Sequence, residues 1–370
     1  MRIHRLEVSY FRNLSSVTVD LGPGLNYFYG PNGAGKTAIL EAVHLLCRGR
    51  SFRTQRVQSL IQNDAPMLVV RAQAEDELTG PVTLAMSKDR RSRTELKING
   101  QSERRLSEAA RLTPLQVMLP DVSDLVFGSP GTRRQWLDWG AFHVKPDYLA
   151  MLREYLRVLK QRNAALKELK SPFEPDPWTL RLVELAECVT ARRRTYLAAL
   201  KPHFHRNLHF LAPELDVSIG LQRGWPESES LEKLLGESVV REVKSGATQW
   251  GAHRADVVLR VGGSRASAVL SRGQGKMVAS VMKIAQASLL SESMHRLTMF
   301  LIDDAGAELD DAHNARFFGL LDELGCQILA TTTAKPDAGP AGTPIESSST
   351  DSGSAKVKMF HVKRGAIEGA

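Results

Sequence analysis

The stretch Gly30-Pro31-Asn32-Gly33-Ala34-Gly35-Lys36-Thr37 decides the fold, because it is a complete phosphate-binding loop. An apolar run over residues 25–29 predicts a strand before it, and residues 37–47 carry apolar side chains at helical spacing after it. The glycines let successive backbone N–H groups turn inward around an anion at the positive end of the helix. Lys36 can then reach the outer phosphates, and the Thr37 hydroxyl can hold Mg²⁺. The sequence therefore predicts a protein that binds a nucleoside triphosphate.

The bulk composition is that of a globular protein with room for two lobes. The chain has 370 residues, of which 42% are hydrophobic and 24% are charged. No apolar stretch approaches membrane-spanning length, and residues 1–10 alternate like a strand instead of forming the apolar block of a signal peptide. Three scattered cysteines, Cys47, Cys188 and Cys326, argue against a disulfide framework. We therefore expect a cytoplasmic protein without a membrane partner.

The charge of the chain is basic and clustered. A formal net charge of +8 favours polyanionic partners, nucleic acid first, because neutralising phosphates releases counterions. The basic residues gather at 88–93, Arg104-Arg105, Arg133-Arg134 and Arg192-Arg193-Arg194. One such cluster is usually a solvated face, but several of them on a chain that binds a nucleotide favour a nucleic acid as partner.

The first part of the chain has the pattern of short strands, and the middle has the pattern of helices. Alternating apolar residues predict strands over 3–10, 17–21, 67–74, 82–88 and 94–98. Segments 147–170 and 178–200 are helical in period and are separated by prolines, so they predict a short antiparallel hairpin. At helical rise each arm is about 35 Å long. The expected inward face of the first arm is formed by Leu149, Leu152, Leu156 and Leu159.

These patterns predict an α/β fold with a mixed sheet around the phosphate loop and an inserted helical lobe. We expect the N-terminal half of the nucleotide-binding lobe at 1–132, the helical lobe at 133–250 and the second half of the nucleotide-binding lobe at 251–333. Residues 334–355, rich in Ala, Pro, Gly, Ser and Thr, form a low-complexity loop, and 356–370 provide a terminal edge strand.

Two carboxylates follow a second apolar strand. The run Met299-Phe300-Leu301-Ile302 ends directly in Asp303-Asp304. A buried strand that ends there can hold Asp303 beside a metal ion, while Asp304 can orient or deprotonate an attacking water. Paired aspartates alone would more simply cap the following segment. Because a phosphate loop lies upstream in the same chain, the metal-and-base interpretation is favoured.

A second helix start suited to an anion lies at Leu270-Ser271-Arg272-Gly273-Gln274-Gly275-Lys276. Ser271 is suited to cap the helix that runs through Met277 to Leu290, and Gly273 allows close backbone approach. Placed about thirty residues before the carboxylate strand, this stretch resembles the signature of ABC-type ATPases. That resemblance implies an ATP-dependent dimer, in which Ser271, Arg272, Gly273 and Gln274 of one subunit contact the γ-phosphate held by the other.

The chain resembles the RecF family of bacterial recombination mediators along almost its entire length. The resemblance is carried by Phe11-Arg12-Asn13-Leu14, Gly30 to Thr37, Arg133-Arg134-Gln135-Trp136-Leu137-Asp138-Trp139, Lys160-Gln161-Arg162-Asn163-Ala164-Ala165-Leu166, Gly251-Ala252-His253-Arg254-Ala255-Asp256, Leu270 to Lys276, Leu301-Ile302-Asp303-Asp304 and Glu308-Leu309-Asp310. Their order and spacing are more specific than any one of them. RecF proteins are similar to the ATPase heads of chromosome-structuring proteins, without the long coiled coil, which agrees with the two short arms.

The resemblance implies ATP and Mg²⁺ as cofactors, slow hydrolysis and an ATP-gated homodimer that binds single- and double-stranded DNA. It also implies work with the RecR and RecO proteins to load recombinase at gaps, and support of the SOS response. Carried onto this chain, Lys36 and Thr37 serve phosphate and Mg²⁺, Asp303 serves Mg²⁺ and Asp304 serves water activation. Arg12 and Asn13 line the nucleotide.

The sequence departs from the pattern of related ATPases at three places. Asp304 stands where most ABC ATPases carry the longer Glu, which favours a timer-like switch over a motor. Ala307 stands where family members usually have Ser. Thr331-Thr332-Thr333 stands where transporter ATPases have a switch histidine, and Gln116 is the nearest candidate for their loop glutamine.

Two other functions compete with a DNA-binding ATPase. The ATPase subunit of a membrane transporter would carry a glutamine-rich docking loop and a switch histidine, and neither is visible in the sequence. A purely structural DNA-bridging protein would bind the nucleotide without turning it over. Outside the nucleotide motifs, we expect the histidines at 203, 205 and 209 to form a helical face, not a metal site, and Trp136 and Trp139 to pack in a core.

Overall fold

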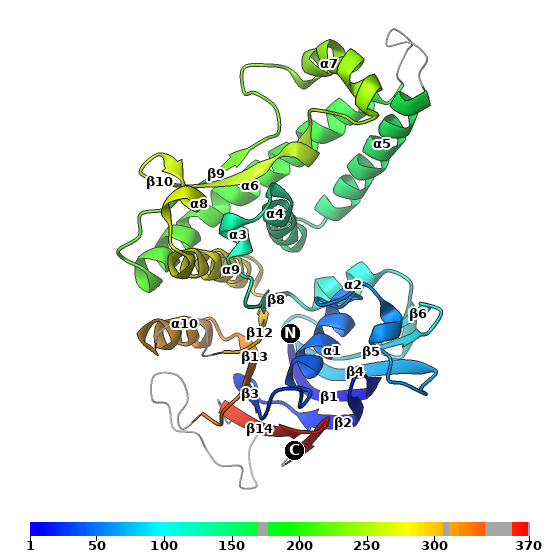
Figure 1. Ribbon diagram of the computed structural model, residues 1–370, viewed down its shortest axis with the longest axis vertical. Helices are drawn as coiled ribbons and strands as arrows, with labels where there is room; N and C mark the ends of the chain where they lie inside the picture. The colour runs from blue at the N-terminus through cyan, green and yellow to red at the C-terminus, as the bar shows by residue number, and fades with distance from the viewer. Residues whose placement is uncertain (169–176, 306–310, 337–356, 369–370) are drawn as a thin grey trace. The chain divides into compact units, whose positions relative to one another are not determined.

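The computed structural model describes residues 1–168, 177–305, 311–336 and 357–368 (Figure 1). The chain divides into two compact units. We call them the sheet unit, Met1–Val122 with Leu290–Ala370, and the helical unit, Ser123–Leu289. Within the described ranges, no helix combines the length and the apolar character needed to cross a membrane.

The sheet unit contains two six-stranded sheets. One is antiparallel, in the order β2-β1-β4-β5-β6-β7, with bounds Leu14–Asp20, Arg2–Phe11, Met67–Asp76, Gly80–Asp89, Thr94–Ile98 and Gln101–Glu103. The other has the order β15-β14-β3-β13-β12-β8, with bounds Ala366–Glu368, Val357–Lys363, Leu25–Tyr29, Gln327–Thr332, Met299–Ile302 and Leu115–Met118. Its strands are parallel except for β15, so the carboxyl ends of β3, β12 and β13 meet at one edge.

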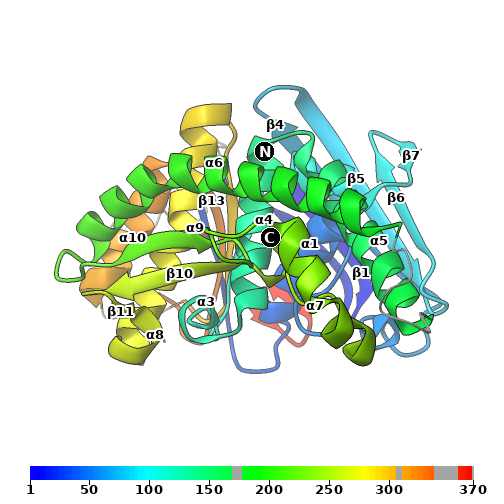
Figure 2. The same cartoon turned by 90° about the horizontal axis from the view of Figure 1, so that it is seen from above.

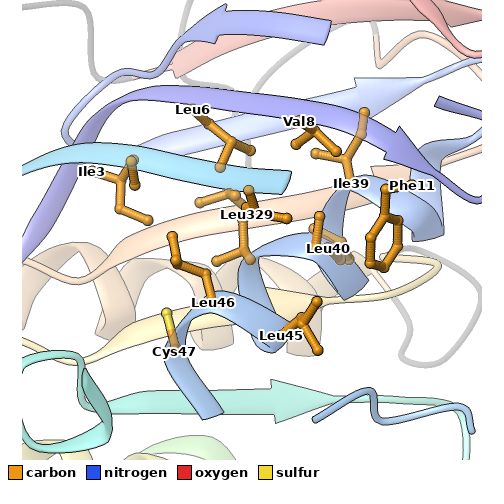
Figure 3. Packing of buried hydrophobic residues seen from close by; sticks show 14 of the residues in the cluster. Ile3, Leu6, Val8, Phe11, Ile39, Leu40, Leu45, Leu46, Cys47 and Leu329 are labelled. Atoms are coloured by element: carbon orange, nitrogen blue, oxygen red, sulfur yellow. The ribbon is translucent and has the colours of Figure 1, made fainter. Parts of the chain in front are cut away.

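Helix α1 (Lys36–Arg48) shares one core with both sheets (Figure 3). Its apolar side chains, among them Ile39, Leu40 and Leu46, pack with Leu6 of the antiparallel sheet and Leu329 of the parallel sheet, and all five are fully buried or nearly so. Burying this much apolar area on two faces of one helix holds its N-terminus in place at the end of β3. The unit also contains η1 (Val57–Ser59), α2 (Leu106–Leu112) and α10 (Asp311–Glu323).

The helical unit combines helices with a three-stranded antiparallel sheet, β11-β10-β9 (Figures 1 and 2). The strands span Ser264–Arg265, Asp256–Val261 and Ser218–Gln222. The helices and short turns are α3 (Asp124–Phe127), α4 (Pro130–Val144), α5 (Tyr148–Glu168), α6 (Thr179–Leu211), α7 (Leu231–Ser245), η2 (Ala252–Arg254) and α8 (Ala266–Val269). Helix α9 (Arg272–Met294) begins in this unit and ends in the sheet unit.

Helices α5 and α6 form the expected hairpin, but two details of the prediction are wrong. Helix α6 has 33 residues and continues through Pro202, because its last turns still bury Phe204 and Leu208. The inward face of α5 is also different, since Leu156 is 48% exposed whereas Tyr155 is buried. Buried Arg162, which pairs with Glu242 of α7, lies on the inward face, and a charged residue there is invisible to an apolar periodicity.

The observed division of the chain differs from the expected boundaries at 132 and 250. Residues 251–289 belong to the helical unit because β10 pairs with β9 and the segment before it is bonded to α4. Most of the expected low-complexity loop lies outside the described residues. The terminal segment supplies β14 and β15. The alternating stretch expected as an edge strand is β14, which pairs with β15 on one side and β3 on the other, so its predicted edge position is wrong and β15 lies at the edge.

Candidate nucleotide-binding site

The phosphate loop connects the end of β3 to the first turn of α1. Gly30 and Gly35 have φ angles of +146° and +115°, which side chains of L-residues rarely adopt. A Cβ atom on Gly30 would lie 2.2 Å from the carbonyl oxygen of Val362, and one on Gly35 would lie 2.9 Å from Leu14. The two glycines therefore allow a tight curve of the backbone in which residues with a side chain could not fit. The N–H groups of the first turn of α1 follow directly after this curve and can bind an anion.

Lys36 is the first residue of α1, and its ammonium group folds back over the loop. The Nζ atom donates hydrogen bonds to the carbonyl oxygens of Gly30, at 2.7 Å, and Pro31, at 3.0 Å. Burial lowers the pKa of Lys36, and the carboxylates of Asp303 and Asp304 oppose that shift. The charge of Lys36 thus lies between the loop and the carboxylates that follow β12.

Asp303 and Thr37 meet although 266 positions separate them in the sequence. The Thr37 hydroxyl donates to the Asp303 carboxylate, at 2.9 Å to Oδ1 and 3.2 Å to Oδ2. The N–H of Asp303 donates to the carbonyl of Met118 at 2.9 Å, which ties the residue to β8. A hydroxyl and a carboxylate oxygen side by side are the hard ligands that Mg²⁺ accepts while it keeps several waters. These residues therefore fit a magnesium ion.

Asp304 projects its side chain into solvent at the same edge. Its φ of +61° is a left-handed conformation, which Asp tolerates better than most residues. Its N–H donates to the hydroxyl of Thr331 at 2.8 Å, and that hydroxyl donates to Oδ1 of Asp303 at 2.7 Å. Thr331 thus holds both aspartates in a fixed relation.

Asn13 and Arg12 flank the loop from the turn that follows β1. The Asn13 side-chain amide donates to the carbonyl of Gly33 at 3.2 Å. Arg12 makes a two-pronged pair with Glu41 of α1, at 2.6 Å and 2.7 Å, and the Glu41 side chain is fully buried. Arg12 is therefore held by α1, while Asn13 touches the phosphate loop.

Sequence reasoning missed two residues of this region. From the sequence, Thr331 is only part of the stretch that replaces a switch histidine, yet it is the next-to-last residue of β13, the strand beside the carboxylate strand. Glu41 was not considered, although a single carboxylate in the apolar run from Ile39 to Val43 is a signal for a buried ion pair. The partner of such a carboxylate cannot be read from local sequence.

The signature segment belongs to the helical unit. Ser271 caps α9 as predicted: its Oγ accepts from the N–H of Gln274 at 3.3 Å, and the Gln274 side chain accepts from the N–H of Ser271 at 2.9 Å. Ser271, Arg272 and Gly273 are exposed, so this helix start is open to a ligand. A Cβ on Gly275 would lie 2.2 Å from the ring of Phe127, so Gly275 serves packing.

Two family motifs of unassigned chemistry form one structural network in the helical unit. Arg133 pairs with Asp256 at 2.7 Å and 3.0 Å, and Arg134 donates to the carbonyl of Ala255 at 2.7 Å. His253 bonds to the hydroxyl of Tyr155 at 2.7 Å, and burial lowers its pKa to about 4. Trp136 is 5% exposed, which confirms its expected place in a core.

Other expectations have mixed outcomes. Gln116 is not in a loop, as a water-binding glutamine would be, because it is buried inside β8 in register with Phe300. Ala307 and Glu308-Leu309-Asp310 lie outside the described residues. No group of three or more His, Cys, Asp or Glu suited to a metal ion occurs among residues that the structure describes. The histidines at 203, 205 and 209 lie in the last part of α6.

Comparisons with known proteins agree with this geometry. Residues 2–353 match the family described as RecF/RecN/SMC N terminal domain. The DNA replication and repair protein RecF of Pseudomonas putida (strain GB-1) is 37% identical over 372 residues, covering 99% of this chain and 98% of the relative. The protein of the same description from Pseudomonas syringae pv. syringae (strain B728a) is 36% identical over 371 residues, again covering 99% and 98%.

Solved structures show the same fold. A structure described as the recombination mediator protein RecF-ATP in the RecFOR pathway has a TM-score of 0.85 and 24% identity, covering 99% of this chain and 97% of that one. A Smc head bound to the C-winged helix domain of ScpA has a TM-score of 0.58 and 16% identity, covering 100% and 96%. The expected ABC-type, SMC-like ATPase head is therefore confirmed as the fold.

Proposed function

Because this chain belongs to the RecF family, we propose that it is an ATP-dependent DNA-binding protein of replication and recombinational repair. The curated relatives at more than a third identity over nearly the whole chain are described as DNA replication and repair proteins. None of these descriptions favours the transporter subunit considered above, and we do not retain that alternative.

The observation that carries the proposal is the contact between Thr37 and Asp303 at the phosphate loop. It joins the loop, at the start of α1, to the carboxylate strand β12 with a hydroxyl–carboxylate distance of 2.9 Å. Such a pair beside a lysine is the arrangement by which nucleoside triphosphatases hold phosphates and Mg²⁺. The proposed cofactors are therefore ATP and Mg²⁺, with Thr37 and Asp303 as the protein ligands of the metal. Bound there, Mg²⁺ would offset the negative charge of the outer phosphates.

The residues of the site have separate roles in a slow hydrolysis. Backbone N–H groups of the loop and the Lys36 ammonium bind the phosphate oxygens. Asp304 orients the attacking water and accepts its proton, from a side chain one methylene shorter than Glu. Thr331 keeps Asp304 and Asp303 in register through its hydroxyl. Asn13 steadies the loop from outside. A shorter base holds water less well, so the enzyme works as a switch.

ATP is proposed to hold two copies of the chain together. Ser271, Arg272, Gly273 and Gln274 of one copy would contact the γ-phosphate in the loop of the other. This proposal is supported by the exposed, reciprocally capped start of α9, where free N–H groups and the helix dipole favour an anion. Hydrolysis would then release the two copies from each other.

The wider role follows the family. We propose that the protein acts at gaps in DNA together with RecR and RecO, helps to load recombinase and supports the SOS response. The relative whose structure contains ATP is described as part of the RecFOR pathway, which supports this assignment.

One set of variants tests the nucleotide chemistry. Lys36→Met should abolish ATP binding, whereas Asp304→Asn should keep ATP binding and abolish phosphate release. Asp121→Asn, an exposed carboxylate of the same unit, is the matched control and should change neither. Undiminished phosphate release by Asp304→Asn would refute its role as the base. Absence of phosphate release from the wild-type protein would favour the structural DNA-bridging alternative.

A second experiment tests the dimer and the DNA. Sedimentation of the purified chain, alone and with gapped DNA, should show a shift to a dimer only with ATP. Ser271→Arg should block that shift without weakening ATP binding by the isolated chain. A dimer that forms equally well with and without ATP would contradict the gating. A chain that binds no gapped DNA, whether or not ATP is present, would contradict the proposed function.

A further inference from the structure

Two segments of the sheet unit carry a concentration of exposed arginines. Residues 50–66, which follow α1, and residues 88–94, the turn between β5 and β6, together contain seven basic residues and two acidic ones. Besides Arg50, which directly follows Gly49 at the end of α1, the exposed arginines of these segments are Arg53, Arg56, Arg90, Arg91 and Arg93. We call these five residues the arginine surface.

Hydrogen bonds hold the two segments side by side. Arg90 donates from Nε to the carbonyl of Ala65 at 2.9 Å and from Nη2 to the carbonyl of Gln62 at 3.1 Å. In return, the Gln58 side chain donates to the carbonyl of Arg90 at 3.2 Å. Arg90 therefore joins the two segments that carry the remaining arginines and keeps these segments next to each other.

The acidic residues nearby do not neutralise this surface. One oxygen of Asp89 accepts from the N–H groups of Arg91, at 2.9 Å, and Arg93, at 2.8 Å, so it shapes the turn through the backbone. Asp64 is exposed on the other segment. Within the described part of the chain, the guanidinium groups of the arginine surface other than that of Arg90 form no ion pair or hydrogen bond. Four positive charges are thus left available to an external partner.

We propose that the arginine surface binds the sugar–phosphate backbone of duplex DNA. Arginine is suited to this ligand because its planar fork donates two parallel hydrogen bonds to a phosphate and always carries its charge. Surfaces that hold single strands add aromatic rings for base stacking. The one aromatic residue of the two segments, Phe52, is partly buried and packs edge-on against His44 at 5.3 Å between ring centroids. The two segments themselves therefore offer charge without an exposed aromatic ring on which a base could stack.

The same segment is anchored to the nucleotide site. The Ser51 hydroxyl donates to Glu41 and accepts from the N–H groups of Arg53, at 2.9 Å, and Thr54, at 3.0 Å. Glu41 in turn holds Arg12, and the next residue, Asn13, donates from its side-chain amide to Gly33 of the phosphate loop. A buried carboxylate thus holds the segment that carries Arg53 and the turn beside the phosphate loop together. This inference rests on the proposed function, because it places the DNA of that function on a named surface.

The test measures duplex binding as a function of salt. Arg91→Gln with Arg93→Gln, and separately Arg53→Gln with Arg56→Gln, remove two charges each from side chains that make no structural bond. With ATP and a short blunt duplex followed by fluorescence anisotropy, each pair should weaken binding on the order of tenfold. Each should also reduce the slope of log affinity against log salt by about 1.8, since each phosphate contact contributes about 0.9.

A matched control separates the surface from net charge. Arg153→Gln with Arg157→Gln removes two exposed arginines from α5 and changes the total charge equally. This control should bind duplex like the wild type, and every variant should bind ATP like the wild type, which shows that the sheet unit is intact. An equal loss in the control would assign the effect to net charge and overturn the inference.

The same measurements distinguish a failure of the proposed function from a failure of the arginine surface alone. Wild-type protein that binds no DNA would defeat the proposed function itself. Wild-type protein that binds duplex, with both pairs of variants binding equally well at an unchanged salt slope, would defeat only the arginine surface. A further variant, at Tyr10, tests binding of single-stranded DNA. Tyr10 is half-exposed, and its carbonyl accepts from the N–H of Gln62 in the first segment. Preferential loss of single-strand affinity in the arginine variants and in Tyr10→Ala would overturn the choice of duplex.

Discussion

Replacing Arg12 by Met isolates the energetic role of the pair between Arg12 and Glu41. The substitution keeps an unbranched apolar stem of similar length but removes the guanidinium group. Glu41 then remains fully buried in α1 with the Ser51 hydroxyl as its only side-chain partner among those that the structure describes. The variant also lacks the bond from Arg12 to the carbonyl of Ser59, at 3.3 Å.

The expected cost follows from burial. Breaking a buried pair by removing one partner costs about 3–5 kcal/mol, because the other charge is left unpaired away from water. The Arg12 side chain is 23% exposed, so water reaches part of the site and the cost should be nearer about 2–3 kcal/mol. For a unit of this size, roughly 2–4 °C of melting temperature corresponds to each kcal/mol, which predicts a fall of roughly 5–10 °C.

Calorimetric melting of four proteins forms the assay: wild type, Arg12→Met, Glu41→Gln and the double variant. The double variant should be more stable than the sum of the single changes predicts, because the neutral amide that replaces the Glu41 carboxylate leaves no buried charge to compensate. We expect a coupling energy of about 1–2 kcal/mol. Strictly additive losses, or an Arg12→Met protein as stable as wild type, would refute the reasoning that the pair is buried and mutually dependent.

Three further predictions concern other parts of the molecule. The pKa of His253 is about 4 in the folded protein and about 6.5 when unfolded, so the unfolded chain takes up a proton that the folded chain does not, and stability falls as the pH drops through that window. His253→Gln should therefore reduce the pH dependence of the free energy of urea unfolding by up to about 1.4 kcal/mol per pH unit. Tryptophan fluorescence can follow this unfolding because all five tryptophans lie in the helical unit. An unchanged slope would contradict the prediction. Gly35→Ala forces a Cβ to within 2.9 Å of Leu14 at a φ of +115°, so ATP affinity measured by titration calorimetry should fall on the order of tenfold, and an unaltered affinity would show that the loop tolerates the side chain. Burial raises the pKa of Cys47 to about 11 and of Cys326 to about 12, whereas Cys188 is exposed. A thiol reagent should therefore label Cys188 in the native protein and the other two cysteines only after unfolding. Fast labelling of all three cysteines in the native protein would contradict the burial of Cys47 and Cys326.

The parts that the sequence predicted well are those encoded by neighbouring residues. The phosphate loop lies between a strand and a helix because its glycines, its lysine and the apolar periods around it stand within about twenty positions of the chain. The strand Met299–Ile302 was predicted by four consecutive apolar residues, and the cap at Ser271 by a serine three positions before a glutamine. Local geometry follows from such spacings because the interactions involved span only one or two turns of chain.

Tertiary structure alone decided what those elements meet. Strand order places Thr331 beside Asp303, α1 places buried Glu41 against Arg12, and pairing of β10 with β9 assigns residues 251–289 to the helical unit. The inward face of α5 was predicted wrongly because it depends on a distant contact in the same way. Arg162 on that face is buried, and it is paired with Glu242, 80 positions further along the chain. Contacts between distant segments depend on how whole faces exclude water and satisfy buried charges together, and no short window of sequence contains both partners.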